Sequence, residues 1–405
     1  MSRPVRLAYL VSHPIHYQVP LLRRLAADPD IDLTVFFQSD LTVRGGFDPT
    51  YGTEIHWDVD LLSGYRYEFL PANGPLDVID FWNPRTHGLW SRLREGRFDA
   101  LWIHGYARFY HLKAMAMARL TGIPVLVRDE ATAISRRRGP VRRLFKRAFF
   151  LILSRLVRSF LTIGCRNAAY YRQCGIPDDR LIGMPYAVDN DYFRTAADAA
   201  RPQLPTLRAT LGLDRDSPVI LYASRLEGRK HADDLLAAYR RLVESGQTHR
   251  PYLLFVGEGE LRLWLETEIA RLGLDRVRLL GFRGQQELPA LFALADVFVL
   301  PAVHEPWGMV INEAMNAGTT VVACDQVGCT ADLIEDGVTG CLVAARDVDG
   351  LAATLLRLLA DPEARRRIGA AGRDRISRFS YAEDVRGLRL ALGLDATIGL
   401  DRVTG

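Results

Sequence analysis

The 405-residue sequence has few of the features that mark disulfide-bonded, metal-stabilised or membrane-spanning chains. Its five cysteines are scattered and lack CxxC spacing, which argues against a disulfide framework or a zinc site and fits a reducing compartment. No unbroken aliphatic or aromatic run exceeds six residues, whereas a membrane helix needs roughly 20. The first apolar stretch turns polar at Ser12, so we expect a buried strand there rather than a signal peptide. We therefore expect a soluble, cytoplasmic chain without nucleic-acid partners.

The net charge of +4 is unevenly distributed. Residues 1–190 contain 26 basic and 18 acidic side chains, whereas the remainder contains 26 and 30. Much of the basic excess lies in "RRRGPVRRLFKRAFFLILSRLVR", residues 136–158. This stretch could lie on the anionic inner face of a membrane, with its arginines toward phosphates and its Phe and Leu side chains buried. We favour the alternative of an ordinary helix, whose apolar side packs on the domain core and whose arginines lie in water.

Short apolar runs alternate with longer helical patterns along the whole chain. The first half contains "VRLAYLV", "DLTVFF", "ALWIHG", "PVLVRD" and "SFLTIG", and the second half contains "VILYAS", "YLLFVG", "VRLLGF", "VFVLP", "TTVVAC" and "GCLVAA". Near-continuous apolar strands separated by helices indicate parallel sheets covered on both faces. The series restarts after a polar stretch, residues 189–205, which we interpret as a hinge. The prediction is an α/β protein with two doubly wound Rossmann-like domains, 1–190 and 200–377, that face each other across a cleft.

Candidate ligand-binding loops follow the strands of the second half, because ligands of such sheets bind at the carboxyl ends of the strands. Arg225, Arg229 and Lys230 follow "VILYAS", and a guanidinium and an ammonium together suit a pair of phosphates. The alternative is three solvated loop cations. "GEGEL" follows "YLLFVG", and its Gly257 and Gly259, on either side of Glu258, would let the backbone approach a ligand closely. The alternative is that the two glycines only form a turn, since glycine pairs of this kind are common in turns.

The third loop, in "VLPAVHEPWGMVINEAMNAG" (299–318), places two carboxylates around a predicted helix start. Gly308 allows close approach, and the helix that follows would end at Gly318. A phosphate would bind the unpaired amides near Gly308 and Met309. Glu305 lies upstream of this helix end and Glu313 about 7 Å inside the helix, a spacing that fits the two hydroxyl-rich ends of a nucleotide sugar. The alternative is a surface residue and a helix-face charge, although a carboxylate among apolar neighbours such as those of Glu313 is costly unless paired.

These motifs together carry a family resemblance. "ASRLEGRKH", "FVGEGEL", "LLGF", "ALADVFVLPAVHEPWGMVINEAMNAGTTVVA" and "EDGVTGCLV", in this order, resemble the retaining glycosyltransferases of family 4, which have the GT-B architecture. The resemblance covers residues 216–375, and more loosely the approach to the hinge. The last helical pattern, 379–393, resembles the helix that crosses back to the first domain, so we assign about 378–405 to that domain.

The resemblance implies a role for each matching residue. Arg225 and Lys230 would hold the diphosphate and stabilise the departing charge, Glu305 would contact the donor sugar, and Glu313 would contact the ribose. The remaining donor positions would be the backbone amides of Gly308, Met309 and Val310 for the distal phosphate and the loop at Phe282 for the base. It also implies that no metal or other cofactor is required, and no Asp-x-Asp motif lies in the three loops described. Cationic side chains and a helix end can neutralise a leaving group as a metal would.

The first half departs from the family pattern after its first strand, where "VSHPIHYQVP" replaces the usual glycine pair. His13 and His16 would contact the acceptor or the sugar, or Ser12 would simply cap a helix that begins near Pro14. We favour capping for Ser12 and leave both interpretations of the histidines open. A second departure is Cys329, where a glycine is common.

Two further strand ends supply candidates for the reaction centre and the acceptor. His104 lies where the family usually has a histidine, and it would hydrogen-bond the donor sugar; the alternative is a satisfied core imidazole. Arg128, Asp129 and Glu130 follow the next strand and are either acceptor-binding residues or an ion cluster without a catalytic role.

The sequence therefore predicts a retaining, metal-independent hexosyltransferase that acts in polysaccharide or glycoconjugate biosynthesis. Its partners would be a nucleotide-diphosphate sugar and a hydroxyl acceptor, such as a glycan or a lipid-linked molecule. The alternatives are a GT-B nucleotide-sugar epimerase, a tailoring enzyme acting on a small molecule, and a non-catalytic scaffold.

Overall fold

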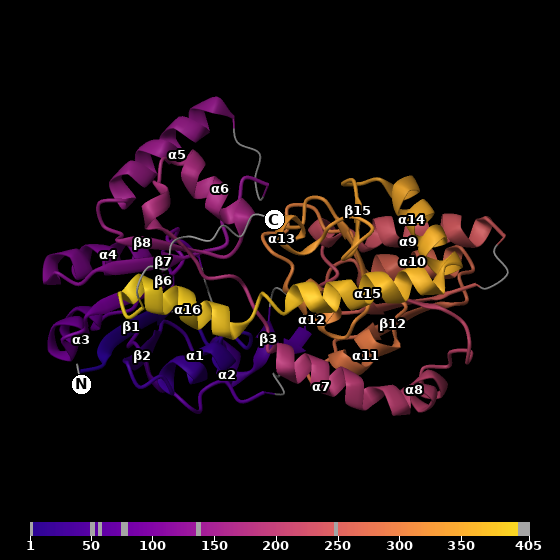
Figure 1. Cartoon of the computed structure of the whole chain (residues 1–405), viewed down its shortest axis with the longest axis horizontal. Helices are drawn as coiled ribbons and strands as arrows, with labels where there is room; N and C mark the ends of the chain where they lie inside the picture. Colours follow the sequence, from indigo (N-terminus) through magenta and orange to yellow (C-terminus); the bar gives the residue numbers. More distant parts are fainter. Residues whose placement is uncertain are drawn as a thin grey trace.

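The computed structural model describes residues 3–48, 53–55, 59–73, 80–134, 139–246 and 250–395. Figure 1 shows two α/β halves side by side, each built on its own sheet, with the chain passing from indigo at the N-terminus to yellow at the C-terminus. All eleven strands predicted from the sequence are present. The prediction of two doubly wound parallel sheets is confirmed.

The first sheet has seven parallel strands in the order β5-β2-β1-β6-β7-β8-β9. These strands are β1 (Val5–Val11), β2 (Ile31–Phe37), β5 (Arg66–Phe69), β6 (Ala100–His104), β7 (Val125–Arg128), β8 (Ser159–Thr162) and β9 (Leu181–Gly183). The intervening helices are α1 (Val19–Ala26), α2 (Leu41–Arg44), α3 (Leu89–Gly96), α4 (Phe109–Thr121), α5 (Pro140–Leu153), α6 (Cys165–Gln173) and η1 (Asp178–Arg180). A separate antiparallel pair, β3 (Gly46–Asp48) and β4 (Thr53–Ile55), follows α2.

The second sheet has six parallel strands in the order β12-β11-β10-β13-β14-β15. These are β10 (Val219–Ala223), β11 (Tyr252–Val256), β12 (Val277–Gly281), β13 (Val297–Leu300), β14 (Thr320–Cys324) and β15 (Cys341–Val343). The helices between and after them are η3 (Gly228–Lys230), α9 (Ala232–Glu244), α10 (Arg262–Arg271), α11 (Leu288–Leu294), α12 (Met309–Asn316), α13 (Thr330–Leu333), α14 (Val348–Ala360) and α15 (Pro362–Ile376).

Both faces of each sheet are buried, which explains why the strands are apolar at nearly every position. Along β1, Ala8 and Leu10 belong to one core cluster, whereas Leu7, Tyr9 and Val11 belong to a cluster on the other face. Successive side chains of a strand point to opposite faces, so a strand covered by helices on both sides needs apolar residues at consecutive positions.

The stretch predicted as a hinge is largely helical. Residues 190–210 form α7 (Asn190–Ala200), η2 (Arg201–Gln203) and α8 (Leu204–Thr210), and α7 packs against α11 and α12 of the second half. Asp189 caps α7 by accepting a hydrogen bond from the Tyr192 amide at 3.1 Å. The chain therefore passes from the first half to the second before α7, along residues 184–189.

The last helix returns to the first half, as Figure 1 shows for α16 (Tyr381–Leu392). It packs on α1, β8 and β9. A Cβ atom on Gly387 would lie 2.1 Å from the Gly183 carbonyl oxygen, so the glycine lets this helix lie directly on the end of β9. Within the described residues, no helix is both long and apolar enough to cross a membrane.

Candidate active site

Each sheet has one point at which the strand order reverses, and several of the predicted site residues lie at these points. In the first sheet the reversal is between β1 and β6, and in the second it is between β10 and β13. Ligands of doubly wound sheets bind at such switch points, beyond the carboxyl ends of the strands. His13 follows β1 and His104 ends β6, whereas Arg225 follows β10 and Glu305 follows β13.

The loops after β10 and β13 bring three cations and two carboxylates together. Oε2 of Glu305 accepts hydrogen bonds from Nζ of Lys230 and Nη1 of Arg229, both at 2.6 Å. Glu227 pairs with Nη1 of Arg225 at 2.7 Å and with Nε of Arg229 at 3.0 Å. The cluster therefore carries a surplus of one positive charge, which favours an anionic ligand. Arg229 was named with Arg225 and Lys230 among the candidate phosphate-binding cations, but the resemblance gave it no role of its own.

Glu305 and Lys230 are both buried, at 8% and 7% exposure. Burial pulls the pKa of Glu305 upward, but Lys230 and Arg229 outweigh it and leave this pKa below its ordinary value. Burial lowers the pKa of Lys230, and Glu305 offsets part of this effect. Among the described residues, no hydrogen bond involves Oε1 of Glu305, so this oxygen remains available to a ligand hydroxyl.

The glycine pair of the second loop allows a close approach, but to the protein's own backbone. A Cβ atom on Gly257 would lie 2.1 Å from the Ser224 carbonyl oxygen, and one on Gly259 would lie 2.6 Å from the Leu226 carbonyl oxygen. The Leu226 amide also donates to the Glu258 carbonyl at 2.9 Å. The glycines thus hold this loop against the start of the cationic loop.

Two further residues predicted to bind the donor, Glu258 and Phe282, lie beside the glycine loop and the cationic loop. The Glu258 carboxylate pairs with Arg262 at the start of α10. Phe282 directly follows β12, and the preceding Gly281 accepts a hydrogen bond from the Gly257 amide at 2.8 Å. The predicted base-contacting loop and the glycine loop are therefore neighbours.

Helix α12 begins immediately after Gly308, as the sequence predicts. Gly308 has a φ of 95°, and a Cβ atom there would lie 2.7 Å from Cγ1 of Val327. The preceding loop is held by hydrogen bonds from the Gly328 amide to the Glu305 carbonyl and from the Cys329 amide to the Trp307 carbonyl, both 2.9 Å. Met309 and Val310, the first two helical residues, are half-buried.

Glu313 is half-buried inside α12 and has neither a hydrogen bond nor an ion pair in the part of the chain that the structure describes. Burial raises the pKa of its carboxyl to about 8. The carboxyl is therefore largely protonated at neutral pH without a ligand, and in this state it can donate a hydrogen bond.

His104 lies in a hydrogen-bonded network that the sequence did not reveal. Nε2 of Gln18 lies 3.2 Å from its Nδ1, and the Tyr186 hydroxyl lies 3.4 Å from its Nε2. The same Tyr186 hydroxyl donates to Glu130 at 2.7 Å. Burial, assisted by the charge of Arg128, lowers the pKa of His104 to about 3, so the imidazole is neutral at physiological pH.

The two halves meet at this network. Burial raises the pKa of Glu130, the Tyr186 hydrogen bond lowers it, and the charge of Glu305 from the second half raises it further. Nδ2 of Asn312 in α12 donates to the Tyr186 carbonyl at 3.1 Å. The strand-end residues of the first half therefore face the cationic cluster of the second.

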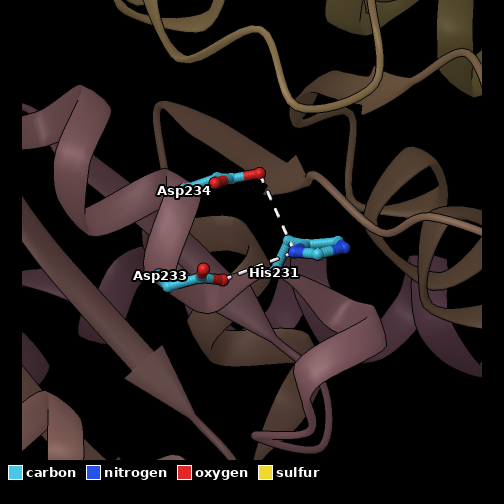
Figure 2. A group of neighbouring side chains, drawn as sticks. All are labelled: His231, Asp233 and Asp234. Atoms are coloured by element: carbon cyan, nitrogen blue, oxygen red, sulfur yellow. Dashed lines mark ion pairs between the residues drawn. The ribbon is translucent and has the colours of Figure 1, made fainter.

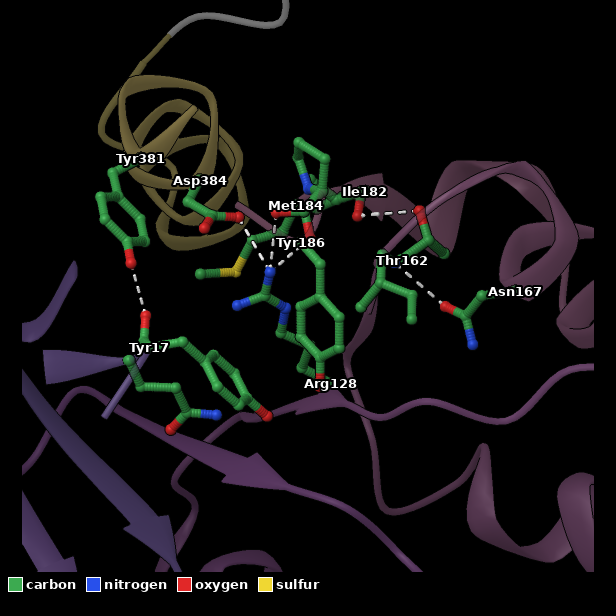
Figure 3. Close-up of polar contacts among 12 residues, drawn as sticks. Tyr17, Arg128, Thr162, Asn167, Ile182, Met184, Tyr186, Tyr381 and Asp384 are labelled. Atoms are coloured by element: carbon green, nitrogen blue, oxygen red, sulfur yellow. Dashed lines mark hydrogen bonds and ion pairs between the residues drawn. The ribbon is translucent and has the colours of Figure 1, made fainter. Parts of the chain in front are cut away.

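Arg128 is a structural residue rather than an acceptor-binding one. It is 1% exposed, and its Nη2 atom donates to the carbonyls of Met184 and Pro185 and to Asp384 of α16, each at 2.9 Å (Figure 3). Its guanidinium also lies over the Tyr186 ring, 4.7 Å from the centroid. A group enclosed in this way cannot reach an acceptor, so the acceptor prediction for Arg128 is wrong.

Asp129 is also engaged internally, since it accepts a hydrogen bond from the Tyr171 hydroxyl. Burial raises its pKa to about 6. Of the three consecutive residues predicted on the acceptor side, Glu130 is the one that faces the second half.

The two histidines after β1 lie in a turn, and Ser12 does not cap a helix. Oγ of Ser12 hydrogen-bonds Nδ1 of His13 at 2.9 Å, while the His16 ring lies edge-on to Tyr17. Helix α1 begins only at Val19, so the prediction of a helix from about Pro14 is wrong.

Within the part of the chain that the structure describes, one group of side chains has the ligand spacing of a metal site. His231, Asp233 and Asp234 have ligand atoms within 4.8 Å of one another, directly after Lys230 (Figure 2). Arg346 pairs with both carboxylates, at 3.4 and 3.3 Å, and its Nη1 contacts the His231 ring. The guanidinium offsets part of the charge of these carboxylates, so the group forms an ion-pair cluster at the start of α9. Asp-x-Asp pairs occur in the sequence at 28–30, 30–32, 58–60, 189–191, 214–216 and 347–349. Asp28 and Asp30 pair with Arg389, and Asp214 pairs with Arg276. Asp189 and Asp347 cap helices.

Comparisons with known proteins bear on both halves. Residues 205–375 match the family model described as "Glycosyl transferases group 1". The chain is 35% identical over 362 residues to a D-inositol 3-phosphate glycosyltransferase of Thermobifida fusca, covering 82% of this chain and 80% of that one. It is 29% identical over 306 residues to an alpha-D-kanosaminyltransferase of Streptomyces kanamyceticus, covering 73% and 75%.

Solved structures show the same fold. A glycosyltransferase from Rickettsia africae superposes with a TM-score of 0.73 at 15% identity, covering 97% of this chain and 99% of that one. An Anabaena protein solved in complex with UDP and glucose gives 0.71 at 18% identity, covering 96% and 100%. Both comparisons span the two sheets, which is the GT-B arrangement.

Proposed function

The chain belongs to the group 1 glycosyl transferases, enzymes of the GT-B fold that use nucleotide-sugar donors. Within this family, we propose that it transfers a hexose with retention at the anomeric carbon and without a metal ion. The observation that carries this proposal is the cluster of Arg225, Arg229, Lys230 and Glu305 at the ends of β10 and β13. The cluster offers an excess of positive charge for a diphosphate and one unoccupied carboxylate oxygen for a sugar.

We assign the donor to the second half. Its diphosphate would displace part of the Glu305 interaction and bind Arg225, Arg229 and Lys230, with the distal phosphate at the backbone amides of Gly308, Met309 and Val310. The protonated or ionised Glu313 carboxyl would meet the ribose, and the loop at Phe282 would meet the base. Oε1 of Glu305 would accept a hydrogen bond from a sugar hydroxyl.

In the transfer step, the bond between the anomeric carbon and the diphosphate oxygen breaks, and its electron pair leaves with the diphosphate. The acceptor oxygen forms its bond on the same face, and the acceptor proton passes to the departing phosphate oxygen. The three cations would stabilise the developing negative charge, as a metal ion does in other enzymes. His104 is neutral at physiological pH, so its part would be hydrogen bonding to the sugar rather than proton transfer.

We place the acceptor at the strand ends of the first half, beside Glu130 and the histidines His13, His16 and His104. A glycan or lipid-linked hydroxyl, as in polysaccharide or glycoconjugate assembly, is the proposed acceptor class. A small hydroxylated molecule is the second candidate, because similar proteins are named for kanosaminyl transfer, for inositol 3-phosphate and for 2-deoxystreptamine.

The test is an NMR time course of the purified chain with a panel of nucleotide sugars, with and without glycan and small polyol acceptors. A new glycoside with the anomeric configuration of the donor supports the proposal. A glycoside of inverted configuration, or conversion of the donor to an epimeric nucleotide sugar without acceptor, contradicts it.

A further inference from the structure

Helix α5 exposes apolar side chains along one face. Its exposed apolar residues are Val141 (65% exposed), Leu144 (70%), Phe145 (72%), Leu151 (62%) and Ile152 (62%), hereafter the α5 face. Counted from Val141, the other four lie three, four, ten and eleven residues further along, which places them on a single stripe of the helix. Five large apolar side chains at such exposure on one helix are not explained by the packing of the domain.

The opposite side of the helix already has its own partners. Phe150 and Leu153 are buried in the core cluster of the first half. The Lys146 ammonium points to this side as well, 4.5 Å from the Tyr106 ring centroid. The expected packing of an apolar side of α5 on the domain core is therefore present, but the core takes only part of the apolar residues, and the α5 face remains outside.

The charged residues of the sequence around this face are all basic. From residue 131 to residue 177 the sequence contains eleven Arg and Lys residues and no Asp or Glu. Arg147, Arg155 and Arg158 are exposed, and Arg147 lies three residues after Leu144 and four before Leu151, at the border of the face. Arg136, Arg137 and Arg138 belong to the same sequence segment but lie outside the described residues.

We propose that the α5 face docks on an anionic lipid bilayer. The apolar side chains would enter the interface between headgroups and acyl chains, and the arginines would contact lipid phosphates. A second copy of the chain fits less well, since it would bring the same excess of arginines against the first. Figure 1 shows α5 at the top of the first half, above β6, β7 and β8 in this view.

The test is sedimentation of the full chain with vesicles of phosphatidylglycerol and phosphatidylcholine in equal amounts, against vesicles of phosphatidylcholine alone. No donor is present, so the result is independent of the proposed transfer reaction. We expect binding to the anionic vesicles that weakens with added salt. Absence of binding, or equal binding to both vesicles, overturns the proposal.

Two variants locate the contact. Leu144→Ser with Phe145→Ser should lower the partition coefficient at least about tenfold, because burial of one large apolar side chain changes an equilibrium constant by roughly that factor. The matched control, Leu120→Ser with Leu263→Ser, changes two equally exposed residues elsewhere, at 78% and 74%, and should bind as the wild type does. Equal loss in both variants overturns the proposal.

Charge reversal gives an independent readout. Arg147→Glu with Arg155→Glu leaves the apolar face intact and should also lower binding to anionic vesicles at least about tenfold. Unchanged binding would contradict docking on an anionic surface. Light scattering tests the alternative that a second copy of the chain covers the α5 face. If the wild type is a dimer, the variant Leu144→Ser with Phe145→Ser is a monomer, and this variant still binds vesicles, the α5 face belongs to a second copy and the proposal is overturned.

Discussion

Nζ of Lys230 lies 2.6 Å from Oε2 of Glu305, and this pair joins the loop after β10 to the loop after β13. An ammonium and a carboxylate that are both buried each lose hydration, so removing either leaves the other uncompensated. Arg229 donates to the same oxygen, so one cation would remain beside the carboxylate if a ligand withdrew the other. The pair thus links the residue proposed for the sugar with a residue proposed for the diphosphate.

Replacing Glu305 with Gln should separate these two roles. The amide keeps the shape of the side chain but cannot neutralise Lys230 and Arg229, so we expect nucleoside diphosphate to bind at least as tightly as it does to the wild type. The transfer rate should fall by about 100-fold or more, as expected when a preorganised charged group is lost from a reaction centre. Glu244→Gln, which removes an exposed carboxylate on α9, is the control. Full activity of Glu305→Gln would refute the sugar-binding role.

Glu313 should make stability depend on pH. Its pKa is about 8 in the folded chain and about 4.5 in the unfolded chain, so between these values the folded state holds a proton that the unfolded state has released. Its contribution to stability is therefore lost as the pH rises through this range. Thermal unfolding of Glu313→Gln and wild type should give a gap in Tm that widens in favour of the variant from pH 5 to pH 8.

The control for this prediction is Glu335→Gln, which changes an exposed carboxyl of the same half. Its Tm should follow that of the wild type at every pH. A gap for Glu313→Gln that stays constant with pH would show that its carboxyl has an ordinary pKa.

The buried pair of Arg128 and Asp384 should anchor α16 to the first half. Asp384→Asn leaves the Arg128 charge uncompensated, and loss of one partner of a buried pair costs about 3 kcal/mol of the free energy of unfolding. Urea unfolding measures this loss. Glu383→Gln, at the neighbouring position of α16, should change stability by less than about 0.5 kcal/mol. Equal effects of the two substitutions would mean that the anchor contributes nothing.

No residue with a side chain should be tolerated at Gly257, because the Ser224 carbonyl oxygen occupies the space that a Cβ atom would need. Its φ is 131°, and an alanine Cβ would lie 2.1 Å from the Ser224 carbonyl oxygen, so Gly257→Ala should cost at least about 2 kcal/mol and displace the cationic loop. Gly183→Ala, where no atom lies within 4 Å of the added Cβ, is the control. Nucleoside diphosphate binding by a stable Gly257→Ala protein at wild-type affinity would contradict the proposed role of this loop.

The sequence predicts the fold well because the apolar runs that mark the strands can be recognised from neighbouring residues alone. Strands buried on both faces need consecutive apolar residues, and the residues just after them mark the strand ends, so the positions of Arg225, Lys230 and Glu305 follow from the order of motifs. In the two parallel sheets, strands β5 and β9 were not predicted. β5 is only partly buried and β9 has three residues, and neither shows the apolar pattern of the central strands.

What the sequence could not predict depends on contacts between distant segments. Arg128 is enclosed by Asp384, which lies 256 positions away in the chain, and nothing local distinguishes such an arginine from an exposed one. The same holds for Gln18 and Tyr186, which reach His104 only in the folded chain. The exposed apolar face of α5 was also not predicted, because the helix has more apolar residues than one core-facing stripe can bury.

Calorimetric binding of a nucleoside diphosphate to Lys230→Met tests the central claim, that the cluster after β10 and β13 is the donor site, most directly. Lys113→Met, which removes an exposed lysine of α4, is the matched control. We predict that Lys230→Met weakens binding at least about tenfold, since a hydrogen bond to a charged group contributes roughly 1.5–3 kcal/mol, while Lys113→Met binds as the wild type does. Wild-type affinity in folded Lys230→Met protein would contradict the assignment.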